Sequence, residues 1–164
     1  MKKISVLLNN VLDGIVTVMF IFMLLCAIMQ VVFRYVMHIS VPWTEEAARF
    51  ALIFVTFWGA ATAIRERDHI SILTLFERIP EKPRNILQVV FIVAMGVFLA
   101  YVFIGSITMV KLTWNTPVGA IPWLTTGRVY LILPTGVILM MLYLIAWLLE
   151  TLQALIIPAN KVKG

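Results

Sequence analysis

Long apolar runs separated by short polar segments dominate the pattern of the chain. Three runs carry almost no charge along their length: Val11–Phe33, Ile86–Val110 and Val129–Leu149. Asp13, near the start of the first run, is the exception. One more run, Phe50–Ile64, reaches a comparable length when it extends back through a few charged residues to residue 44. Because a helix needs about 20 apolar residues to cross the hydrocarbon core of a bilayer, the pattern predicts transmembrane helices over residues 11–33, 44–64, 86–110 and 123–150.

These runs are expected to be helical. An open sheet would leave backbone groups unpaired in lipid, and runs such as Val137–Leu142 lack the alternation of barrel strands. Pro122 suits a helix that begins near Trp123, and Pro134 with Gly136 predicts a kink in the last helix. Two pairs of small residues have the four-residue spacing of close contacts between membrane helices: Gly59 with Ala63, and Gly96 with Ala100.

A shorter amphipathic segment lies between the second and third spans. Its apolar residues recur at helical spacing, at Ile72, Leu75, Phe76 and Ile79. Pro80 follows and ends the pattern. We expect a short helix over residues 70–79 that lies at the membrane interface, with a plain loop as the alternative. The predicted fold is all-α, a single membrane domain over residues 1–164.

Composition supports a membrane protein and argues against the soluble classes. Hydrophobic residues make up 62% of the chain and charged residues 13%, whereas soluble domains have about 45–50% and about 25%. This composition excludes a soluble enzyme and a disordered tail. A disulfide scaffold is excluded because the single cysteine, Cys26, has no partner in the chain. The first run is longer than the apolar core of a cleaved signal peptide, so a retained helix is expected.

The basic residues predict the orientation of the spans. The net charge is +5, which in a membrane protein reports loop topology rather than nucleic-acid binding. If the N-terminus is cytoplasmic, nine of the 13 Lys and Arg residues fall on that side: Lys2, Lys3, Arg65, Arg67, Arg78, Lys82, Arg84, Lys161 and Lys163. The outer side then holds Arg34, Arg49, Lys111 and Arg128. The positive-inside rule therefore predicts that both termini are cytoplasmic.

A charged cluster lies where the first two spans meet at the outer face. Arg34 ends the first span, while Glu45, Glu46 and Arg49 lie in the first turns of the second, just after Trp43. The spacing predicts that Arg49 pairs with one glutamate and Arg34 with the other, and that Trp43 lies at the headgroup level. The cluster is either a structural clamp for the first hairpin or a docking site at a subunit interface.

The remaining polar residues do not form a recognisable chemical site. His38 and His69 fall on opposite membrane faces, so they cannot share a haem. Arg65 and His69 are instead expected to hold the interfacial helix to lipid or to a partner subunit. The chain has no phosphate loop, HExxH or GxSxG motif, and no charge at the middle of a span. We expect neither an enzyme nor a cofactor or metal site, but a supporting subunit; a structural assembly protein and a small oligomeric transporter are the alternatives.

Two stretches carry a family resemblance. The first hairpin combines, at fixed spacing, Arg34, Trp43, Glu45, Glu46, Arg49, Gly59, Arg65, His69, Ile70 and Pro80. The later stretch Ile121-Pro122-Trp123 is followed by Tyr130, Pro134 and Gly136. Over roughly residues 10–150, this pattern resembles the small membrane subunit of tripartite ATP-independent periplasmic (TRAP) transporters, the DctQ-like family.

The resemblance implies a place in an uptake system of several proteins. Such transporters pair this kind of subunit with a large multi-helix membrane subunit, which holds substrate and sodium, and with a soluble periplasmic substrate-binding protein. The small subunit would support the large one in the bilayer of the bacterial inner membrane and help dock the binding protein. The implied substrates are organic acids such as sialic acid or C4-dicarboxylates. No cofactor of its own and no nucleic acid would be involved, and sodium coupling would reside in the large subunit.

Overall fold

The computed structural model describes residues 2–66 and 81–156, with side chains described for residues 9–66 and 87–153. The elements are helices α1 (Lys2–Tyr35), α2 (Pro42–Glu66), α4 (Glu81–Thr113), α5 (Thr126–Tyr130) and α6 (Ile132–Ile156), and strands β1 (Pro117–Val118) and β2 (Ile121–Thr125). Within these described residues, four stretches are long and apolar enough to cross a membrane: Asn9–Tyr35, Pro42–Glu66, Leu87–Thr113 and Thr126–Gln153. The predicted set of spanning helices is therefore confirmed. The interfacial helix expected over residues 70–79, with His69, lies outside the described residues.

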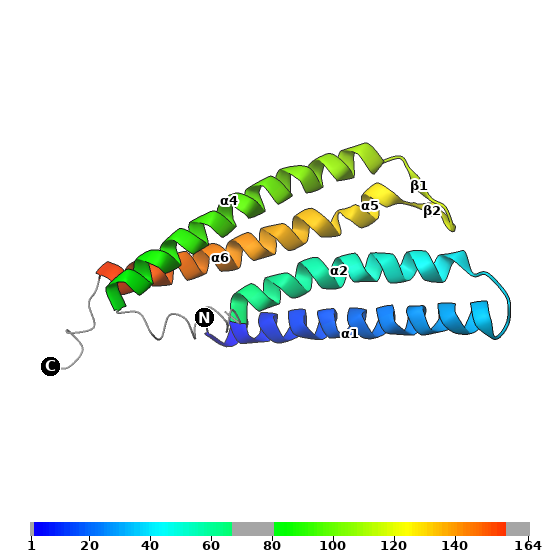
Figure 1. Ribbon diagram of the computed structural model, residues 1–164, viewed down its shortest axis with the longest axis horizontal. Helices are drawn as coiled ribbons and strands as arrows, with labels where there is room; N and C mark the ends of the chain where they lie inside the picture. The colour runs from blue at the N-terminus through cyan, green and yellow to red at the C-terminus, as the bar shows by residue number, and fades with distance from the viewer. Residues whose placement is uncertain (1, 67–80, 157–164) are drawn as a thin grey trace.

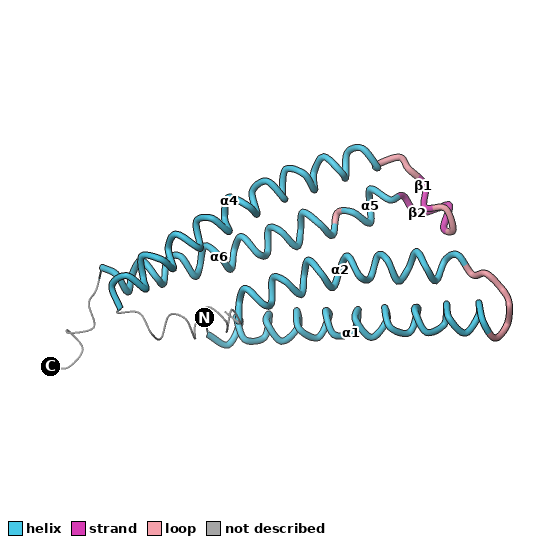
Figure 2. The backbone as a smooth tube through the Cα atoms, in the orientation of Figure 1, coloured by secondary structure: helices cyan, strands magenta, loops and turns pink. Residues whose placement is uncertain are grey.

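The long helices form an open row in the order α1, α2, α6, α4 (Figure 1). Helix α1 packs on α2, α2 on α6, and α6 on α4. The α1–α2 connection and the β1–β2 hairpin lie at one end of the row, which we call the hairpin end (Figure 2). At the opposite end, α1 and α4 begin and α2 and α6 end. We call it the clamp end, after the cluster around Arg65 that lies there. The two edge helices, α1 and α4, leave broad apolar faces exposed, as lipid-facing helices do.

The apolar core lies around α6, where α2 and α4 pack on it. Buried side chains there include Ala61, Ile92, Val137 and Leu144. Small residues let the helices approach closely: a Cβ on Gly59 would lie 3.7 Å from Val16 of α1, and one on Gly96 would lie 3.6 Å from Leu144 of α6. Both glycines of the predicted small-residue pairs therefore lie in contacts between helices, where close backbone approach favours packing in lipid.

The last span is interrupted a short distance before Pro134, where the sequence predicts a kink. The helical path of the last span breaks at Leu131, between α5 and α6. Pro134 has no N–H to donate to the carbonyl four residues earlier and its ring crowds that turn. The Thr135 hydroxyl lies 2.9 Å from the carbonyl oxygens of both Leu131 and Ile132, so its one proton is shared between two acceptors near the break.

The all-α expectation is incomplete, because the connection before α5 holds a two-stranded antiparallel sheet. Strand β1 pairs with β2, with Val118 opposite Ile121, so Gly119 and Ala120 form the tip. The last span accordingly begins its helix at Thr126 rather than near residue 123. Pro122 lies in β2 instead of starting a helix, a position that proline tolerates in a short edge strand. A Cβ on Gly127 would lie 2.5 Å from the Cα of Trp114, so the end of α4 and the start of α5 are in close contact.

Candidate functional site

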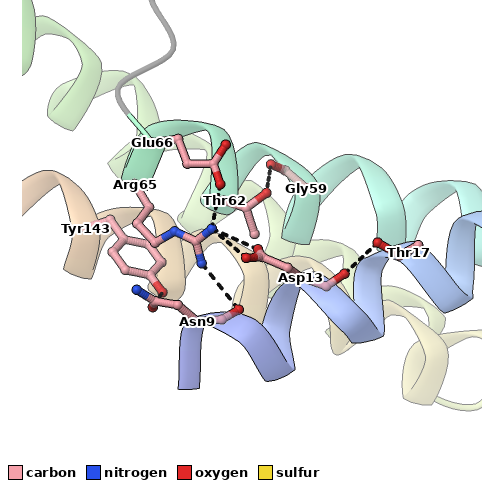
Figure 3. Close-up of polar contacts among 8 residues, drawn as sticks. All are labelled: Asn9, Asp13, Thr17, Gly59, Thr62, Arg65, Glu66 and Tyr143. Carbon is pink, nitrogen blue, oxygen red and sulfur yellow. Dashed lines mark hydrogen bonds and ion pairs between the residues drawn. The ribbon is translucent and has the colours of Figure 1, made fainter. Parts of the chain in front are cut away.

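At the clamp end, Arg65 of α2 lies at the centre of a polar cluster (Figure 3). Its Nη2 donates to both carboxylate oxygens of Asp13 on α1, at 2.9 and 2.8 Å. The same nitrogen lies 2.8 Å from Oε1 of Glu66. Its Nη1 donates to the backbone carbonyl of Asn9 at 3.4 Å. The Arg65 guanidinium therefore joins two helices through both charge and backbone contacts.

A further helix enters the same cluster through Tyr143. The hydroxyl of this α6 residue lies 3.2 Å from Oδ1 of Asn9, to which it donates. The cluster formed by Asn9, Asp13, Arg65, Glu66 and Tyr143, which we call the Arg65 clamp, thus connects α1, α2 and α6. Because α6 belongs to the second half of the chain, the clamp joins residues far apart in the sequence.

Burial makes the central ion pair of the clamp more than a surface contact. The Arg65 side chain is 13% exposed, while Asp13 is 42% and Glu66 54% exposed. Asp13 and Arg65 both lie inside candidate spanning stretches, where an unpaired charge is costly. The predicted role of Arg65 and His69, to hold the interfacial helix to lipid or to a partner subunit, stays a prediction because that helix lies outside the described residues. Within the described residues, the Arg65 guanidinium contacts Asn9, Asp13 and Glu66.

Sequence reasoning missed Asn9, Asp13 and Tyr143 as members of this cluster. A signal for one of them was available: Asp13 is the lone charge of the first apolar run. In an antiparallel hairpin with its turn near residues 36–41, Asp13 lies at about the same height as Arg65. Asn9 and Tyr143 carried no comparable signal, since the contact of α6 with α1 depends on the order of the helices in the row.

At the hairpin end, the residues of the predicted charge cluster lie together, but their ion pairs and hydrogen bonds differ from those expected. Arg49 donates to Oε1 of Glu45 at 3.2 Å, the i,i+4 pair expected from the spacing. Gln30 of α1 donates to the other oxygen of Glu45 at 3.4 Å. Within the described residues Arg34 forms no ion pair, so its predicted pairing with a glutamate is wrong. Both oxygens of Glu45 already have partners, and Glu46 faces another element.

Glu46 instead holds the hairpin. Its Oε2 accepts the backbone N–H of Ala120 at 3.0 Å, and a Cβ on Gly119 would lie 3.3 Å from its Oε1. Tryptophan side chains surround this end: Trp43 is 44%, Trp114 47% and Trp123 78% exposed. Such residues are typical of the boundary between membrane and water. The hairpin end therefore presents a small sheet, an aromatic rim and the exposed charges of Arg34 and Arg49.

Several hydroxyl groups between the two ends bond within their own helices. The hydroxyls of Thr56, Ser106 and Thr108 donate to carbonyls three or four residues earlier, at 2.7 to 3.0 Å. These groups are thereby satisfied without a partner helix, a water or a ligand.

The sequence matches known proteins over most of its length. The family model for the DctQ component of tripartite ATP-independent periplasmic transporters matches residues 12–154. A TRAP transporter small permease protein of Haemophilus influenzae is 25% identical over 124 residues, which cover 74% of this chain and 77% of that protein. The isethionate TRAP transporter permease protein DctMQ of Oleidesulfovibrio alaskensis is 29% identical over 94 residues, covering 54% of this chain and only 15% of that protein. The sialic acid TRAP transporter small permease protein SiaQ of Vibrio cholerae is 29% identical over 85 residues, covering 51% and 49% of the two chains.

Proposed function

The chain belongs to the DctQ component family of TRAP transporters, and we propose that it is the small scaffold subunit of a sodium-coupled, binding-protein-dependent uptake system. Proteins of this family are components of transporters rather than enzymes. The observation that carries the proposal is the family match over residues 12–154, which includes nearly all of the candidate spanning stretches.

The interior of the spans supports a scaffold role. A membrane protein that moves its own substrate and ion generally carries polar or ionisable groups at depth and discontinuous helices around the binding site. Here the charged residues lie toward the two ends of the row, and the hydroxyls between them bond to their own backbone. In this proposal the substrate and sodium sites belong to a large multi-helix partner subunit.

The relative DctMQ supports such a partner. The matched part is only 15% of that permease, which leaves room in the same polypeptide for a much larger permease portion. The present chain would likewise work with such a large unit. It would pack beside the open row, where the exposed apolar faces of α1 and α4 are available.

The orientation follows from the charges. We place the clamp end in the cytoplasm of a bacterial cell and the hairpin end in the periplasm, within the inner membrane. Nine of the 13 Lys and Arg residues then lie on the cytoplasmic side, as the positive-inside rule requires. The periplasmic binding protein would meet the hairpin end, where Arg34, Trp43 and Arg49 are exposed.

The substrate in this proposal is an organic acid of the sialic acid or C4-dicarboxylate type. The named relatives serve sialic acid in one case and isethionate in another, and both are acids. Because the hydroxyls of Thr56, Ser106 and Thr108 bond to their own helix backbones, we assign the choice among acids to the large subunit and the binding protein.

Reconstitution tests the proposal. We expect the tagged chain to co-purify in detergent with the large permease subunit encoded beside it, and uptake of a labelled acid into proteoliposomes to require both subunits, the binding protein and a sodium gradient. Uptake by this chain alone would identify a small oligomeric transporter. Failure to retain any large permease partner would favour a structural assembly protein.

The charge cluster at the hairpin end, which includes Arg34, Glu45 and Arg49, gives a finer test. Arg49→Glu is expected to reduce uptake by the complete system while the complex still assembles. Arg128→Glu, which makes the same charge change at another exposed arginine of the hairpin end, is the matched control. Unchanged uptake with Arg49→Glu would remove this cluster from the docking surface.

A further inference from the structure

An open groove lies at the hairpin end, between the last turns of α4 and the start of α6. Its volume is about 480 Å³, within the range of about 300–1,000 Å³ typical of ligand sites. The apolar part of its lining comes from Ile107, Val110, Leu131 and Pro134. The rim carries Lys111, Trp114 and Asn115.

Helix packing forms this groove, so its shape is fixed before a ligand arrives. Val110 is 8% exposed and Pro134 is buried, so they belong to the packed floor. Leu131, at 42%, and Trp114, at 47%, remain exposed at the edges. The close approach of Gly127 to the Trp114 backbone holds the two walls together at the rim.

The rim is positively charged and matches a phosphate. Lys111 makes no ion pair within the described residues, and none of the residues that line the groove is acidic. It lies near the end of the spanning stretch Leu87–Thr113, the level at which lipid phosphates occur. Its ammonium, the Trp114 indole and the Asn115 amide are all hydrogen-bond donors, and lysine is a common partner of phosphate groups.

We propose that this groove binds one anionic glycerophospholipid, with its phosphate at Lys111 and an acyl chain along the apolar floor. A free inorganic anion would leave the apolar floor exposed to water. A wholly apolar helix from a partner would cover Lys111 without a counter-charge, which is costly. A lipid that is charged at one end and apolar at the other satisfies both parts of the groove, and the bilayer around the protein supplies it.

Native mass spectrometry of the full-length chain, titrated with phosphatidylglycerol, tests the site. One lipid is expected to bind more tightly than the rest, with phosphatidylcholine binding more weakly. Lys111→Gln is expected to weaken the tight event about fivefold, since one lysine near anionic lipid contributes about 1 kcal/mol. Lys111→Arg should restore it. Arg128→Gln removes a charge at the same end but outside the groove, and should leave it unchanged.

A second pair of variants tests the apolar part. Leu131→Trp fills the groove and is expected to abolish the tight event, while Ile138→Trp places the same side chain at a similarly exposed position of α6 outside the groove and should not. Equal binding by the wild type, Lys111→Gln and Leu131→Trp would overturn the proposal. Displacement of the tightly bound lipid by inorganic phosphate as effectively as by phosphatidylglycerol would also overturn it, because the occupant would then be a free anion. So would a purified complex in which Leu131→Trp releases the large subunit rather than a lipid.

Discussion

Removing the carboxylate of Asp13 is expected to destabilise the helix row by loosening α1 from α2. Asp13→Asn keeps the size of the side chain but removes the charge that accepts two hydrogen bonds from Arg65, at 2.9 and 2.8 Å. Arg65 is 13% exposed, so its guanidinium would keep Glu66, a long contact to Asn9 and one neutral amide acceptor in place of the carboxylate.

The expected loss is about 1.5–3 kcal/mol, the range for hydrogen bonds to charged groups. The larger cost of about 3–5 kcal/mol for breaking a fully buried ion pair does not apply, because the Asp13 side chain is 42% exposed. Glu66→Gln is the matched control: Glu66 contacts the same guanidinium at 2.8 Å but is 54% exposed. A pair that is this open to solvent contributes about 1 kcal/mol or less.

The assay is reversible unfolding of the purified full-length chain in bicelles, for the wild type, Asp13→Asn, Arg65→Gln and the double variant. The double-variant cycle should give a coupling energy of at least about 1 kcal/mol between Asp13 and Arg65, as contacting charged pairs do. The reasoning is refuted if Asp13→Asn lowers the free energy of unfolding no more than Glu66→Gln does. It is also refuted if the effects of Asp13→Asn and Arg65→Gln are additive.

Other predictions concern packing, the hairpin and a turn. Gly136→Ala is expected to cost about 1–3 kcal/mol through overpacking, since its Cβ would lie 2.8 Å from that of Phe57; Gly105→Ala, with nothing within 4 Å, should be neutral or stabilising by the same unfolding assay. Glu46→Ala should speed hydrogen exchange at the Ala120 amide about tenfold or more, while Glu46→Gln, which keeps an acceptor, should change it less. His38 has a positive φ of 55°, so His38→Gly should stabilise the chain by about 1 kcal/mol and His38→Val should destabilise it, measured by thermal unfolding.

The spans and one ion pair could be predicted from sequence because both depend on local patterns. A run of apolar residues long enough to cross a bilayer needs no knowledge of its neighbours. The Glu45–Arg49 pair follows from helical spacing alone. Arg34 shows the limit of this reasoning, because its expected glutamates were taken by Gln30 and by the Ala120 N–H.

The hairpin and the Arg65 clamp could not be predicted in the same way because they depend on tertiary arrangement. The stretch 117–125 has two prolines and reads as a loop. Its tip is held by Glu46, a residue 74 positions away in the chain. The contact of Tyr143 with Asn9 requires α6 to lie near α1 at the clamp end, and an almost uniformly apolar sequence does not specify which helices become neighbours.

The chain has two apolar halves, α1 with α2 and α4 with α5 and α6, and their contacts indicate how they stay together in lipid. Apolar packing between helices gains little from the hydrophobic effect there, since lipid tails are as apolar as leucine, so close packing and hydrogen bonds must contribute. Along the seam between the halves, Gly136 of α6 lies close to Phe57 of α2. Polar contacts lie toward its ends, Tyr143 with Asn9 at the clamp end and Glu46 with Ala120 at the hairpin end. These contacts involve few residues and leave the outer faces of α1 and α4 uncommitted. The row can therefore hold its own order while both edges stay open to lipid or to a partner, which is the property a scaffold subunit requires.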